Sequence, residues 1–202
     1  MKDLRSPALP VESFPSQAKF RAWLKTHHTT SPGIWLKLHK KASGQPSLTY
    51  AEALEEALCF GWIDGQKKPF DADSWLQRVT PRRPKSNWSQ VNTRHVERLI
   101  AAGRMTPAGL KEVERAKSDG RWERAYASSQ HSLPPADFLE ELEKHPPSAA
   151  FYRTLNKANV YAIVYRLQTA KKPETRAKRM TVILEMLKRD QTFHPQGRKP
   201  SA

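Results

Sequence analysis

The residues best suited to bind an anion lie between Trp62 and Trp88. Guanidinium groups present forked donors to phosphate or carboxylate, and serine, asparagine and the free N–H groups of a helix start add neutral donors. An indole ring can stack on a base or another ring. The candidate residues for an anionic small molecule or phosphate are Trp62, Asp64, Gln66, Arg78, Arg82, Arg83, Ser86, Asn87 and Trp88.

The spacing of these residues supports two interpretations. Trp62, Asp64 and Gln66 alternate on one face of an expected strand, and Arg78 shares a face with Thr80 on the next one. In the functional interpretation they form a ligand pocket or a contact surface for nucleic acid. In the structural one, Asp64 pairs with Arg78 or Arg82, the tryptophans fill the core, and the serine and asparagine cap a helix. The tryptophans favour the structural interpretation, whereas the arginines fit both equally.

Other chemically capable residues do not form a recognisable catalytic or metal set. Cys59 lies in an apolar helical run and is interpreted as a buried core residue. The histidines are dispersed, and Glu52, Glu55 and Glu56 are expected on a solvated helix face. Phosphate-binding glycine loops and nucleophile motifs do not occur. The sequence therefore predicts no catalytic residue, no metal and no cofactor, and an enzyme is disfavoured.

The composition limits the class of protein. The 202 residues carry 35 basic and 20 acidic side chains, a net charge of +15, which attracts polyanions such as nucleic acid. One cysteine allows no internal disulfide. No apolar run approaches the roughly 20 residues of a membrane span, and no signal peptide is recognised, so a cytoplasmic location is expected. Nothing in the sequence sets the oligomeric state.

The periodicity predicts an α+β fold that is predominantly α. Ile34, Leu36 and Leu38 alternate with polar or larger residues as in a half-buried strand, and Thr49 with Glu52 forms a capping box at a helix start. We expect a small antiparallel sheet of about three strands packed with helices. The predicted segments are a flexible arm (1–15), an α+β domain (16–126), a C-terminal helical segment (136–190) and a disordered tail (191–202), with a linker near 127–135.

Several motifs resemble the YdeI/OmpD-associated (OmdA, bacteriocin-protection) family. They are "YAEALEEALCFGWIDGQ", "RVTPRRPKSNWSQVN", "RLIAAGRMTPAGL", "AKSDGRW" and "AKKPETRAKRM", and the resemblance covers about 34–187. The resemblance implies a role in protection against bacteriocins or cationic antimicrobial peptides, or in envelope stress. It implies no reaction, cofactor or catalytic residue. The alternatives are a nucleic-acid or anionic-ligand binding protein, and an enzyme acting on an anionic small molecule with Asp64 as its base.

Overall fold

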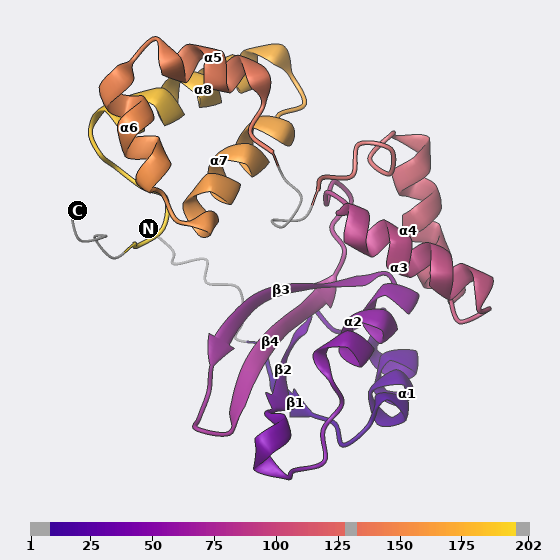
Figure 1. Ribbon diagram of the computed structural model, residues 1–202. Coiled ribbons are helices and arrows are strands. Elements are labelled where there is room, and N and C mark those ends of the chain that lie inside the picture. The colour runs from indigo at the N-terminus through magenta and orange to yellow at the C-terminus, as the bar shows by residue number, and fades with distance from the viewer. Residues whose placement is uncertain (1–8, 128–132, 197–202) are drawn as a thin grey trace, which may run out of the picture. The chain divides into compact units, whose positions relative to one another are not determined.

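The computed structural model describes residues 9–127 and 133–196, which divide into two compact units. The first unit contains 9–88 and 92–124 and holds the sheet (Figure 1). The second contains 89–91, 125–127 and 133–196 and is helical. Parts of the predicted arm (1–8), linker (128–132) and tail (197–202) lie outside the described residues.

The sheet of the first unit has four strands in the order β1-β2-β4-β3. β2 (Ile34–His39), β4 (Ser74–Pro81) and β3 (Trp62–Pro69) pair antiparallel, which confirms the predicted strands. A fourth strand, β1 (Val11–Ser13), adds parallel to β2 and makes the sheet mixed. This segment was expected to be part of a flexible arm. The strand was not predicted because three residues are too few to show the alternation of a strand.

One face of this sheet packs against α1 (Gln17–His27) and α2 (Tyr50–Cys59), which lie along it in Figure 1. Trp62 on β3 meets Trp23 of α1 edge to face, with ring centroids 5.9 Å apart. The alternation in β2 is confirmed, since its three aliphatic residues are fully buried. On this face the buried strand residues are Ile34, Leu36, Leu38, Trp62, Gln77 and Val79.

The helix starts follow local chemistry. Thr49 and Glu52 form the predicted capping box at the start of α2. Thr106 caps α4 (Pro107–Ser118), and proline occupies its first position, where the missing N–H is harmless. The remaining elements of this unit are a 3-10 turn, η1 (Lys41–Ser43), and α3 (Gln90–Ala101), which belongs to it from Asn92 onward.

The contact between α2 and α4 requires a glycine. A Cβ at Gly109 would stand 2.3 Å from the carbonyl oxygen of Cys59. The same carbonyl accepts a hydrogen bond of 2.7 Å from the Thr106 hydroxyl. The end of α2 therefore packs directly against the start of α4.

The second unit consists of α5 (Ala136–Glu143), α6 (Pro146–Thr154), α7 (Lys157–Gln168) and α8 (Pro173–Lys188). Its core is formed by Phe138, Leu142, Ala149, Ile163, Leu167, Ile183 and Leu187. This is the predicted C-terminal helical segment.

The chain after α8 is held against this unit as far as the structure describes it. The Asn159 side chain, 1% exposed, donates to the His194 carbonyl at 3.1 Å and accepts from its N–H at 2.9 Å. The Arg166 guanidinium lies 3.8 Å from the centre of the Phe193 ring. Residues 191–196, expected as part of a disordered tail, therefore have defined contacts.

Candidate functional site

The predicted anion-binding residues do not converge on one site. Trp62 is 1% exposed, and its indole N–H donates to the His28 carbonyl at 3.1 Å. Because it fills the interface with α1, the structural interpretation holds for this residue. Replacing a buried tryptophan by alanine typically costs about 3–5 kcal/mol.

Asp64 and Arg78 lie on opposite faces of the sheet. Asp64 pairs in register with Val79, so its side chain shares the face that packs on the helices, and it accepts a 2.6 Å hydrogen bond from the Tyr50 hydroxyl. Arg78 points to the other face, together with Thr80 as predicted. The pairing of β3 with β4 shifts register between Asp64 and Lys67. This shift interrupts the predicted alternation of Trp62, Asp64 and Gln66 on one face, and Gln66 is exposed. The weighed Asp64–Arg78 ion pair therefore does not form.

Arg82 and Trp88 form a buried cation–π contact. The guanidinium carbon of Arg82 lies 3.4 Å from the centre of the Trp88 ring, and the two residues are 6% and 2% exposed. Arg82 also donates to the Asn87 carbonyl at 3.3 Å. These contacts fix the loop after β4, and the burial of Trp88 is the core role that was expected of it.

Two partners of this loop, Arg121 and Trp122, were not among the predicted site residues. Arg121, 3% exposed, donates to the Ser86 carbonyl at 2.8 Å and to the Asp119 carboxylate at 2.7 Å. Trp122 lies 5.0 Å from Trp88, centroid to centroid. Both partners come from the chain after α4, more than 30 residues away, and no local pattern marks them.

The rest of the loop is exposed or forms a turn. The Ser86 hydroxyl accepts from the Arg83 N–H at 3.1 Å, and the Ser86 N–H donates to the Arg83 carbonyl at 2.9 Å. Asn87 is half-buried, while Arg83 and Lys85 are exposed. Of the candidate arginines, Arg78 and Arg83 thus remain accessible to a ligand.

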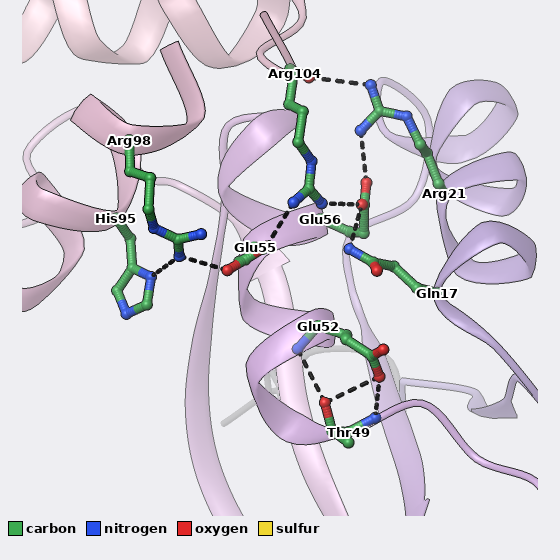
Figure 2. Close-up of polar contacts among 9 residues, drawn as sticks. All are labelled: Gln17, Arg21, Thr49, Glu52, Glu55, Glu56, His95, Arg98 and Arg104. Carbon is green, nitrogen blue, oxygen red and sulfur yellow. Dashed lines mark hydrogen bonds and ion pairs between the residues drawn. The ribbon is translucent and has the colours of Figure 1, made fainter. Parts of the chain in front are cut away.

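Glu55 and Glu56 of α2 are not on a solvated face, which corrects the expectation for these two residues. Figure 2 shows both carboxylates facing arginines from other elements. Glu56, 2% exposed, accepts from Arg21 of α1 at 2.6 Å and from Arg104 at 2.7 Å. Glu55 accepts from Arg104 at 2.7 Å and from Arg98 of α3. The group ties α1, α2, α3 and the loop before α4 together.

Electrostatics favour the ionised form of Glu55. Burial acts to raise the pKa of Glu55, but hydrogen bonds from Arg98 and Arg104 outweigh it and lower that pKa. Burial raises the pKa of the Cys59 thiol, with the nearby Glu56 charge acting in the same direction. A thiol kept protonated and 0% exposed is a core residue, as predicted.

The sheet face turned away from α1 and α2 carries several cations, and we call it the cationic face. Lys37 lies on β2, Lys68 on β3 and Arg78 on β4, and their register places all three on this side. Lys68 is exposed, and the other two are partly exposed. The face also includes Trp35, Ile63, Leu76 and Thr80, with Phe70 at its hairpin end.

The described residues offer no metal site, since nowhere in 9–127 and 133–196 do three or more His, Cys, Asp or Glu side chains gather as metal ligands would. Across the same residues, every helix is too short or too polar to cross a membrane.

Comparison with protein families identifies both units. A model for a domain of unknown function (DUF8412) matches residues 12–112, half of the chain. A second model, described as "Bacteriocin-protection, YdeI or OmpD-Associated" (OmdA), matches residues 134–190. The chain therefore belongs to the DUF8412 domain family and carries an OmdA domain in its second unit.

The predicted family resemblance is thus confirmed for the C-terminal part of the chain. The motifs between 50 and 110 lie under the DUF8412 model, which has no described function. Searches of curated proteins and of solved structures found no significant match.

Proposed function

We propose that this chain is a non-catalytic binding protein for anionic ligands, and that it contributes through this binding to the bacteriocin protection named by its C-terminal family. The observation that carries the proposal is the separation of charge in the first unit. Glu55 and Glu56 of α2 are neutralised by arginines between helices, whereas Lys68 and Arg78 of the cationic face have no carboxylate at ion-pair distance among the described residues.

The net charge restricts how such protection would work. A chain with a charge of +15 repels a cationic peptide, so sequestering that peptide directly is disfavoured. The same charge attracts the anionic molecules that a cationic peptide also seeks. Protection through an anionic partner is therefore the mechanism that fits the electrostatics.

An enzyme with Asp64 as its base has less support. That function needs Asp64 and arginines around one pocket. Arg78 lies on the other face of the sheet, and Arg82 is buried against Trp88. The Asp64 carboxylate instead accepts a hydrogen bond from Tyr50.

The proposal is tested by thermal stability of the full chain with inorganic phosphate, polyphosphate and heparin. A ligand that binds the native state raises the melting temperature. We expect polyphosphate and heparin to raise it at low salt, and the rise to shrink in the double variant Lys68→Gln/Arg78→Gln. The matched control is Lys25→Gln/Lys111→Gln, which removes the same charge from exposed sites on α1 and α4.

A rise that is equal in the two double variants would show that net charge alone attracts the anion and would refute a site on the cationic face. No rise with any anion would refute the binding function itself. The link to protection is tested separately, by survival of a bacterial host that produces each variant during exposure to a bacteriocin.

A further inference from the structure

Rings and cations alternate on the cationic face. The Lys68 ammonium lies 4.2 Å from the centre of the Trp35 ring, and the Lys37 ammonium lies 4.8 Å from the centre of the Phe70 ring. Phe70 is 52% exposed, an unusual position for a large apolar ring. Leu76, the register partner of both lysines, is only 3% exposed. The lysine stems therefore cover apolar surface while their charged ends stay in water.

Few acidic groups balance these cations. Lys37 lies 3.3 Å from the Asp71 carboxylate at the hairpin turn. Hydrogen bonds from Ser74 and Asp73, with the nearby lysine, lower the pKa of Asp71 to about 2. Lys68 and Arg78 have no ion-pair partner in the described part of the chain, and each therefore offers its full charge to a ligand.

Arg78 lies beside a glycine of the neighbouring strand. It lies across from Trp35 on β2 and next to Gly65 on β3. A Cβ at Gly65 would stand 3.7 Å from the Arg78 side chain, so the glycine leaves that side of the guanidinium stem uncovered. The glycine lies within the register shift of β3.

We propose that the cationic face binds a single-stranded nucleic acid, with Phe70 stacking on a base and Lys37, Lys68 and Arg78 contacting phosphates. This inference rests on the proposed anion-binding function and names its partner. Aromatic side chains interleaved with cations on an exposed surface are how proteins hold single strands, because every unpaired base has a ring face to stack on and every nucleotide a phosphate.

The rings favour a single strand over the other polyanions. A duplex hides its base faces within the stack, so Phe70 would gain nothing from it. Polyphosphate and heparin have no aromatic faces. An anionic membrane attracts the same cations but needs apolar side chains that insert, and this surface presents only the one strongly exposed ring, Phe70, at its hairpin end.

The test is fluorescence anisotropy of a labelled oligothymidylate of about twelve nucleotides with the full chain at about 0.1 M salt. Each phosphate contact to a single strand contributes about 0.7 to the slope of log K against log salt. Lys68→Gln/Arg78→Gln is therefore expected to weaken binding about 25-fold and to reduce the slope by about 1.4. The control Lys25→Gln/Lys111→Gln should change affinity less than about threefold.

Phe70→Ala separates stacking from charge. It removes no charge and alters an exposed side chain, so the fold should be unaffected, which circular dichroism checks. Loss of one stacked base is expected to weaken oligonucleotide binding at least about fivefold and to leave polyphosphate binding unchanged.

The outcomes distinguish this inference from the function it rests on. If polyphosphate and heparin bind through Lys68 and Arg78 but the oligonucleotide binds no tighter and Phe70→Ala has no effect, the nucleic-acid inference is overturned and anion binding stands. If none of the three binds, both fall. Tighter binding to anionic phospholipid vesicles than to the oligonucleotide, through the same residues, would also overturn the inference.

Discussion

Removing the buried carboxylate of α2 should destabilise the first unit more than any single exposed charge. In Glu56→Gln the residue keeps its shape but loses the charge that faces Arg21 and Arg104. Taking one partner from a buried ion pair costs about 3–5 kcal/mol, because the remaining charge is left without compensation. The two arginines are 29% and 33% exposed and keep part of their hydration, so we expect the lower end, about 3 kcal/mol.

Urea unfolding followed by tryptophan fluorescence reports this loss of stability for the first unit of the protein. All six tryptophans lie in the first unit, so their emission is insensitive to the helices of the second. The control is Glu114→Gln, which changes an exposed glutamate of α4 and should alter the free energy of unfolding by less than about 0.5 kcal/mol.

A loss below about 1 kcal/mol in Glu56→Gln would refute the reasoning, since it would mean that the arginines find equal compensation in water. An equal loss in Glu114→Gln would refute it as well, because net charge rather than the buried network would then control stability.

Three further predictions follow from contacts in the two units. Because the pKa of Glu55 is lowered in the folded state, the stabilisation from its ionised carboxylate is fully present above the ordinary glutamate pKa and is lost as pH falls through the lower folded value. The stability difference between wild type and Glu55→Gln, measured in urea, should therefore shrink as pH falls below the ordinary glutamate pKa. Gly109→Ala should destabilise the first unit by about 1–3 kcal/mol or more, because the added Cβ would overlap the Cys59 carbonyl. A thermal melt followed by tryptophan fluorescence measures this loss, and an unchanged melting temperature would contradict that geometry. Asn159→Ala should cost the second unit about 1–3 kcal/mol and free the chain around His194, so that limited proteolysis cuts there faster than in the wild type.

Much of the fold was predictable because its signals are local. The aliphatic alternation of β2 and the capping box of Thr49 and Glu52 each lie within a few residues, and both are confirmed. β1 was not predictable because it gains its hydrogen bonds from β2, about 24 residues away, and is too short to show a period.

Little of the candidate site was predictable, because the contacts that decide its burial come from distant parts of the chain. Arg82 and Trp88 have the types and spacing of an anion site, but their burial depends on Arg121 and Trp122 from beyond α4. Glu56 was expected in solvent because a glutamate on a helix usually is. Its arginine partners come from segments 35 and 48 residues away, which no pattern within one helix can indicate.

The sheet ends on one side with β3, whose neighbour in the sheet is β4 alone. Strands in this position expose unpaired backbone groups to which another chain can add, and proteins discourage this with lysine and proline. β3 ends in Lys67, Lys68 and Pro69, so these residues guard against edge-to-edge aggregation. Selection for solubility and selection for ligand binding would then act on the same lysine, Lys68. Neutralising it should increase self-association at high protein concentration, which light scattering detects even when the fold is intact.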